Sequence, residues 1–121
     1  MNNLLLVFTG GGLGSILRYS IGEFVKANFK FIFPIATLCS NFISCIILSI
    51  FIIIFNEKII STSNLKVFFL IGFCGGLSTF STFSFETIEL IKAGNFTIAI
   101  FNILISLTAC LATIYFLTKH L

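Results

Sequence analysis

The chain has 121 residues, of which 58% are hydrophobic and only 9% are charged, and its mean hydropathy is +1.17. An average soluble domain has roughly 25% charged residues, and a fold this small has too much surface to cover with so few charges. The net charge of +3 comes from scattered residues, which argues against a nucleic-acid partner. The composition therefore excludes an ordinary cytosolic globule and a disordered chain, and it predicts a protein solvated by lipid.

The positions of the cysteines and of the single histidine argue against a metal site or a catalytic site built from their side chains. The cysteines are Cys39, Cys45, Cys74 and Cys110, all in apolar stretches and none in a CxxC pair. The single histidine, His120, lies next to the C-terminal residue. We therefore expect packing cysteines rather than a disulfide framework or a zinc site, and no enzyme, since no nucleophile–base pair is evident.

Uncharged stretches divide the chain into membrane spans. A spanning helix needs about 20 apolar residues, and the spacing of the charges predicts four of them. The expected spans are about 3–25, 33–55, 65–90 and 95–118. The loops are short, so residues 1–121 are expected to form a single transmembrane four-helix domain, with the first span retained as a helix rather than cleaved as a signal peptide.

The lysines give almost no preference for one orientation in the membrane. Four spans place both termini on one side. The counted residues are Lys58, Lys66 and Lys119 on that side, and Lys26, Lys30 and Lys92 on the other, with Arg18 set deeper. By the positive-inside rule, either another feature fixes the orientation or the chain inserts both ways round. In the second case a homodimer could be antiparallel.

The first span combines small residues with a charge. Gly10 and Gly14 form a GxxxG pair, a spacing that lets two helices approach closely in lipid. Arg18 follows one turn later, and an arginine inside a span costs a few kcal/mol unless it snorkels or finds partners. An interfacial anchor and a group that steers anions toward a vestibule both remain open for Arg18.

Two further spans carry polar stripes at helical spacing. The second span has Thr37, Asn41 and Ser44, and the fourth has Asn102, Ser106, Cys110 and Thr113. Each set lies on one helical face. An asparagine in lipid must be hydrogen-bonded, so the Asn41 face points inward, either as interhelical glue or as the lining of a pore.

The third span is the most unusual. Gly75 and Gly76 are followed directly by a run rich in serine and threonine, where helix propensity is poor. We expect the helix to break near the membrane centre, with its freed carbonyls satisfied by protein, water or an ion. Carbonyls without a nearby acid suit a hard monovalent cation. The alternative is a kinked helix in which Ser and Thr bond back to the backbone.

Phe80 and Phe83 share a face of this span. A phenyl ring has an electropositive edge, so two ring edges, hydroxyls and the Asn41 amide could replace part of an anion's hydration shell, although ordinary packing would also explain the spacing. No acid or histidine lies in mid-span, which favours a passive pathway over proton coupling. The donor-rich lining, with Arg18 nearby, favours an anion.

Three segments together resemble the CrcB/Fluc family of fluoride channels. They are Gly11–Tyr19, Thr37–Asn41 and Gly72–Phe83, and the resemblance extends over all four spans. It implies an all-α membrane protein whose third helix is broken mid-membrane, assembled as an antiparallel dual-topology homodimer with two pores. It also implies a passive channel in the cell membrane, plasma or inner, that exports fluoride and protects microbes from it.

Carried over position by position, the resemblance assigns roles to individual residues. Pore roles fall on Phe80 and Phe83 (ring edges), Asn41 (amide), Ser81 and Thr82 (polar groups of the break), Ser106 (fourth-span hydroxyl) and Thr37. The backbone carbonyls of Gly75 and Ser78 would hold a structural sodium ion at the dimer centre. This chain departs from the family pattern at Ser78, which is often Thr, and at Asn102, where some members have Tyr.

Two other classes of protein share part of this pattern. A small multidrug-type exporter also has four spans, but it usually needs an acid inside the first span, and here the first acid is Glu23 at its end. A purely structural membrane subunit would explain the glycines but not the hydroxyl-rich break. Glu86 and Glu89 receive no role from the sequence and are interpreted as boundary charges.

Overall fold

The computed structural model describes residues 2–56 and 63–121, and every regular element in those ranges is helical. The elements are α1 (Asn3–Asn28), α2 (Ile35–Asn56), α3 (Ser63–Lys66), the π-helix η1 (Val67–Phe73), α4 (Cys74–Leu77), α5 (Phe80–Lys92) and α6 (Phe96–Thr118). The loop that contains Lys58, counted above for orientation, lies outside the described residues.

Four segments are long and apolar enough to cross a membrane, as the sequence predicts. They are Asn3–Asn28, Ile35–Asn56, Asn64–Lys92 and Phe96–Thr118. The first continues to Asn28 rather than ending near residue 25, and the second begins at Ile35 rather than at 33. The later start reflects Pro34, which has no N–H to donate and whose carbonyl accepts the Leu38 N–H at 3.2 Å.

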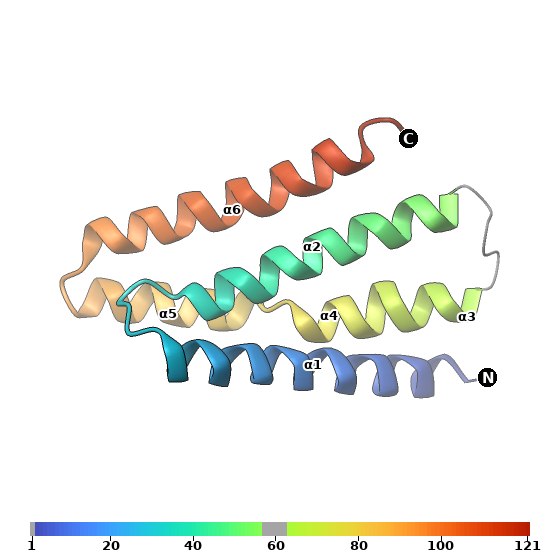
Figure 1. Ribbon diagram of the computed structural model, residues 1–121, viewed down its shortest axis with the longest axis horizontal. Helices are drawn as coiled ribbons and strands as arrows, with labels where there is room; N and C mark the ends of the chain where they lie inside the picture. The colour runs from blue at the N-terminus through green and yellow to red at the C-terminus, as the bar shows by residue number, and fades with distance from the viewer. Residues whose placement is uncertain (1, 57–62) are drawn as a thin grey trace.

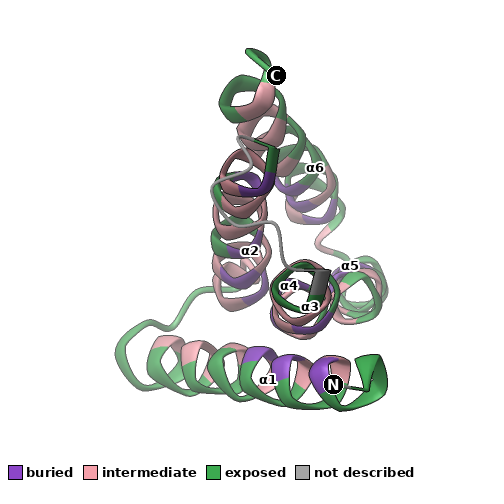
Figure 2. Ribbon diagram, turned by 90° about the vertical axis from the view of Figure 1, so that its right-hand side faces the viewer, coloured by how far each residue is buried: buried purple, intermediate pink, exposed green. Residues whose placement is uncertain are grey.

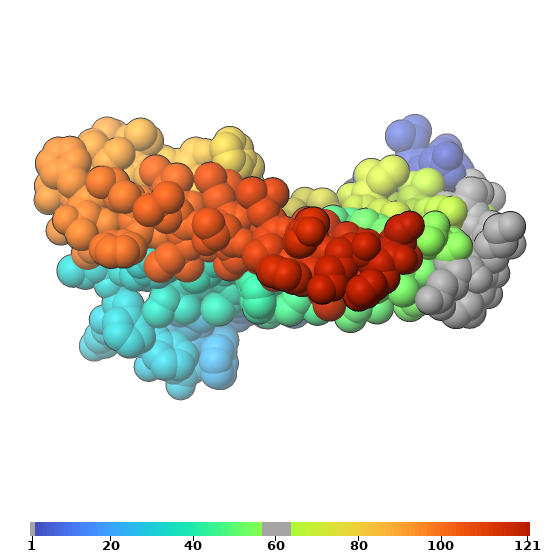
Figure 3. All heavy atoms as spheres, turned by 90° about the horizontal axis from the view of Figure 1, so that it is seen from above, coloured from blue at the N-terminus to red at the C-terminus, as the bar shows by residue number. Residues whose placement is uncertain are grey.

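The spans run side by side, with both chain ends at the same end of the bundle (Figure 1). The connection 29–34 and the turn between α5 and α6 lie at the opposite end. Seen along the bundle, α1 crosses beneath the segment formed by α3, α4 and α5, and the buried residues lie on the faces that meet inside the bundle (Figure 2). From above, α6 lies over α2 (Figure 3).

The turn between α5 and α6 depends on one glycine. Gly94 has φ +83°, a left-handed conformation that often ends a helix at its C-terminus and that glycine adopts without steric cost. The next N–H, that of Asn95, donates to the Leu90 carbonyl at 2.8 Å. The chain therefore reverses within a few residues and sets α6 antiparallel to α5.

Helix α1 packs backbone to backbone against η1 and α4. A methyl group added at Gly10 would lie 2.5 Å from the Phe68 carbonyl oxygen, and one added at Gly14 would collide with the Phe73 carbonyl oxygen. The GxxxG pair thus permits a close approach within the chain, as expected from its spacing. The partner of the pair is the first half of the third span.

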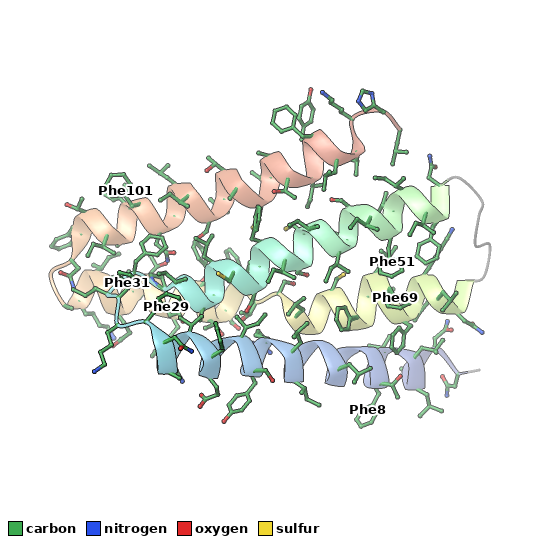
Figure 4. The ribbon with its side chains drawn as sticks, in the orientation of Figure 1. Phe8, Phe29, Phe31, Phe51, Phe69 and Phe101 are labelled. Carbon is green, nitrogen blue, oxygen red and sulfur yellow. The ribbon has the colours of Figure 1, made fainter. Side chains whose placement is uncertain are left out.

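The outer surface is apolar. Phe8 and Phe101 point away from the bundle, whereas Phe51 and Phe69 meet between α2 and η1 (Figure 4). The Phe51 and Phe69 rings stack with centroids 4.0 Å apart. Many large hydrophobic side chains besides Phe8 and Phe101 are exposed, far more than a monomer in water tolerates. Lipid is the solvent that matches this surface.

We predict that Gly14→Ala destabilises the fold and that Gly12→Ala does not. Gly14 meets the backbone of η1 and α4, whereas nothing lies within 4 Å of a methyl group at Gly12. Overpacking of this kind costs about 1–3 kcal/mol. The measurement is thermal unfolding of both purified variants in detergent. Equal unfolding temperatures would contradict the packing assigned to Gly14.

Candidate functional site

The third span has an interruption two residues long. Helix α4 ends at Leu77, and Ser78 and Thr79 have extended backbones, with φ and ψ of −83° and 155° and of −151° and 119°. Helix α5 then begins at Phe80, where the Thr79 hydroxyl caps it by accepting the Thr82 N–H at 3.2 Å. A β-conformation N-cap threonine of this kind is a common helix start.

Asn41 on α2 holds the interruption in place. Its Oδ1 accepts the Thr79 N–H at 2.7 Å, and its Nδ2 donates to the Thr79 carbonyl at 3.2 Å. One side-chain amide therefore replaces the backbone partners that a continuous helix would supply. An amide nitrogen carries two protons, so the second N–H of Asn41 remains for another acceptor.

Side chains from other spans satisfy two carbonyls of α4. The Cys74 carbonyl accepts from the Ser78 N–H at 3.0 Å, the Ser78 hydroxyl at 2.8 Å and the Ser44 hydroxyl at 3.0 Å. The Gly76 carbonyl accepts from Nε of Arg18 at 3.0 Å. Arg18 is thus tied to the helix interruption, and Ser44 faces inward as the stripe on the second span predicts.

The Gly75 carbonyl has a different environment. Its helical donor would be the Thr79 N–H, which bonds to Asn41 instead, and no other partner is found for it among the described residues. Gly75 is exposed, and nothing lies within 4 Å of a methyl group added there. An unpaired carbonyl is costly in a lipid environment.

A cavity of about 220 Å³ lies beside the interruption. It is lined by Asn41, Cys45, Ser78, Thr79, Phe80, Phe83, Ser106, Leu107 and Cys110, all within the described ranges and none with a formal charge. The Phe80 and Phe83 ring centroids are 5.7 Å apart. Phe83 is 8% exposed, but Phe80 is 74% exposed on the surface of the single chain.

A second cavity, of about 170 Å³, lies toward the end of the bundle that carries Lys26. It is lined by Arg18, Gly22, Lys26, Ala36, Thr37, Ser40, Thr79, Thr82 and Glu86. Thr79 lines both cavities, so the two adjoin at this residue. Of the residues that the sequence assigns to a pore, Asn41, Phe80, Phe83 and Ser106 meet in the first cavity, whereas Thr37 and Thr82 lie in the second.

Ser81 lines neither cavity. It is exposed, and its hydroxyl lies 3.3 Å from the Thr79 hydroxyl. Glu86, interpreted from the sequence as a boundary charge, lies instead in the second cavity. Its Oε1 accepts the Thr37 hydroxyl at 2.8 Å, and its buried Oε2 has no partner among the described residues. Glu86 lies four residues after Thr82 and therefore on the same face of the helix, which is the signal that the sequence offers for this placement.

A hydrogen-bond relay connects the first cavity to the packing of α5 on α6. The Ser106 hydroxyl donates to Oδ1 of Asn102 at 3.2 Å, the Asn102 amide donates to Thr87 Oγ1 at 2.9 Å, and Thr87 donates to the Phe83 carbonyl at 2.7 Å. A carbonyl only accepts, so it fixes the direction of every bond in the relay. The Ser106 proton points at Asn102, and its lone pairs are left for the cavity.

The sequence did not single out Thr79, Thr87 or Cys45. Thr79 acts through its backbone and its cap, which composition does not reveal. Thr87 lies four residues after Phe83 and Cys45 four after Asn41, so helical spacing alone was the available signal for both. Cys110 was placed correctly on the polar stripe of the fourth span.

Four apolar spans around internal hydroxyls and amides define a multi-pass helical membrane protein. The model of the family described as "CrcB-like protein, Camphor Resistance (CrcB)" matches residues 5–117. The chain belongs to this CrcB-like family, as the sequence motifs indicate.

Similar proteins cover nearly the same length. A Clostridium perfringens protein named fluoride-specific ion channel FluC is 41% identical over 103 residues, which are 85% of this chain and 80% of that protein. Proteins of the same name from Azobacteroides pseudotrichonymphae and Coxiella burnetii are 36% and 38% identical, over 98% and 91% of this chain and 98% and 90% of theirs. Relatives named as ion channels agree with the prediction that the chain is not an enzyme.

We predict that Asn102→Leu destabilises the packing of α5 on α6. Leucine keeps the branching at Cγ and the number of side-chain heavy atoms but removes the acceptor of Ser106 and the donor to Thr87, and interhelical hydrogen bonds in membranes contribute about 1 kcal/mol each. The matched control is Thr108→Val, since the Thr108 hydroxyl bonds only to carbonyls of its own helix. Unfolding in detergent measures both. A loss no greater for Asn102→Leu than for the control would contradict the relay.

Proposed function

We propose that this chain forms a passive fluoride-selective ion channel. The observation that carries the proposal is the uncharged cavity beside the helix interruption, where the Asn41 amide and the Phe80 and Phe83 rings meet. The relatives named as fluoride-specific channels support the choice of ion. Moving down its gradient, fluoride leaves the cell whenever its cytoplasmic concentration exceeds that outside, which lowers the internal concentration.

Fluoride is small and strongly hydrated, so removal of its water is costly unless fixed donors replace it. Available donors at the first cavity are the second N–H of Asn41 and the electropositive ring edges of Phe80 and Phe83. The start of α5 adds unpaired backbone N–H groups and the positive end of the helix dipole. Neutral donors of this kind bind the ion weakly enough to let it leave.

The second cavity supplies the approach to the pore. Its charged lining residues are Arg18, Lys26 and Glu86, so two cations face one carboxyl group, and an excess of positive charge in a cleft raises the local concentration of anions. The Thr37 and Thr82 hydroxyls offer further polar groups there, and Ser81 does so on the surface beside the break. We assign to Arg18 both a structural role, through the Gly76 carbonyl, and a role in the vestibule.

We also propose that the working assembly is an antiparallel homodimer in the cell membrane. The exposed Gly75 and Phe80 require a cover from outside the chain, and the balanced lysines at the two ends support insertion in both orientations. A second copy placed there would complete the wall of the cavity at Phe80. The remaining surface contacts lipid.

A structural sodium ion fits the unsatisfied Gly75 carbonyl. Backbone carbonyls are hard oxygen donors that suit an alkali cation, and the Gly75 and Ser78 carbonyls, with their counterparts in a second copy, would hold it. When bound, the ion would neutralise the negative ends of the two interrupted helices. Ser78 contributes through its backbone, so a serine in place of threonine keeps the ligand.

We predict that Phe80→Ile and Phe83→Ile each reduce fluoride efflux at least about tenfold, because isoleucine has no electropositive edge to replace water. The assay is efflux from liposomes containing purified protein, read with a fluoride electrode and a parallel chloride measurement. Phe101→Ile, on an outward-facing position of α6 (Figure 4), is the control. Efflux at the wild-type rate in either pore variant would refute that residue's role, and absence of efflux from folded wild-type protein would refute the channel.

We predict that replacement of sodium by N-methylglucamine on both sides of the membrane lowers fluoride efflux and weakens the dimer. Ser78→Ala, which retains the carbonyl, should respond to sodium as the wild type does. Efflux and cross-linking of the two copies are measured across a sodium titration. A dimer and an efflux rate that are both indifferent to sodium would exclude the structural ion.

A further inference from the structure

Two cysteines from neighbouring helices line the first cavity. Cys45 comes from α2 and Cys110 from α6, and both line the cavity with Asn41 and Phe83. The two helices pack against each other, and both cysteines are free and partly exposed. Two thiols that line one cavity form a pair that the fluoride pathway does not require.

The other cysteines are placed differently. Cys39 lines neither cavity, and Cys74 is only 2% exposed. No group of three or more histidine, cysteine or acidic side chains suited to a metal occurs in the described ranges. Ions that need three or four protein ligands, such as zinc, therefore find no site here. A pair of thiols instead suits a soft cation that binds two ligands in line.

Charge decides between the soft cations. A monovalent cation on two thiolates leaves one negative charge in a cavity walled by Leu107 and phenylalanine rings, and an unpaired charge is costly there. A divalent cation on two thiolates gives a neutral complex. The cavity chemistry therefore favours a divalent, strongly thiophilic ion of the mercuric type.

We propose that Cys45 and Cys110 form a two-thiolate site for such a cation, and that the bound ion closes the fluoride pathway. Two S–H bonds break, two S–Hg bonds form and two protons pass to water, with no change of oxidation state. The bound ion would lie among Asn41, Phe83 and Ser106, where fluoride has to pass. The closure rests on the proposed channel function, whereas the binding does not.

The binding test uses mercuric ion and the purified full-length protein in detergent. We expect the ultraviolet absorption of a two-sulfur mercury complex to saturate at one ion per chain in the wild type and in Cys39→Ser, the matched control. Cys45→Ser and Cys110→Ser should each abolish that absorption. Gel filtration checks that the variants are folded. Retention of the two-sulfur signal in either variant would overturn the site.

The flux test adds mercuric ion to liposomes and compares each variant with its own metal-free efflux. We expect block in the wild type and in Cys39→Ser, reversal by excess dithiothreitol, and at least about a tenfold higher concentration for block in Cys45→Ser and Cys110→Ser, since one thiolate replaces two. Binding without block would overturn the closure. Absence of metal-free efflux from the wild type would instead refute the channel and leave the binding test to judge the site.

Discussion

Every backbone N–H and C=O group within a membrane span needs a hydrogen-bond partner. The interruption at Ser78 and Thr79 removes the helical partners of several such groups. Water is not available in the hydrocarbon region to satisfy the freed groups. The chain supplies replacements from two other places, the Asn41 amide and the Arg18 guanidinium, and the Ser44 hydroxyl adds a further bond to the Cys74 carbonyl. Polar side chains of the first two spans therefore form hydrogen bonds with the backbone of the third, and the first cavity lies beside these contacts.

This arrangement explains why the small residues of α1 lie where they do. Arg18 reaches the Gly76 carbonyl only because α1 lies in backbone contact with η1 and α4, which Gly10 and Gly14 permit. A larger residue at Gly14 would separate the helices and withdraw the guanidinium from its acceptor. The packing of the first span and the hydrogen bonding of the break in the third therefore depend on each other, and together they place Arg18 at the second cavity.

The sequence predicts the spans well because lipid imposes a strong rule on charge placement, and the four expected spans coincide with the four membrane-spanning segments to within a few residues. Asn41 and Phe83 reach one cavity because helical spacing alone places them on inward faces. Hydrogen bonds between residues of different helices are harder to predict from the sequence. That Asn102 bonds to Thr87, and that Glu86 accepts from Thr37, depend on the relative rotation and height of helices, which periodicity within one span does not determine.

The direction of the hydrogen bonds decides which wall of the first cavity offers donors and which offers acceptors. The Phe83 carbonyl orders the relay through Thr87 and Asn102, so Ser106 turns its proton away from the cavity. Asn41, by contrast, keeps a free N–H after it has paired with Thr79. Donors therefore concentrate on the side of the cavity formed by Asn41 and α5, and acceptor lone pairs lie on the α6 side. An anion is drawn to the wall that holds the start of α5, because the positive end of the helix dipole also lies there.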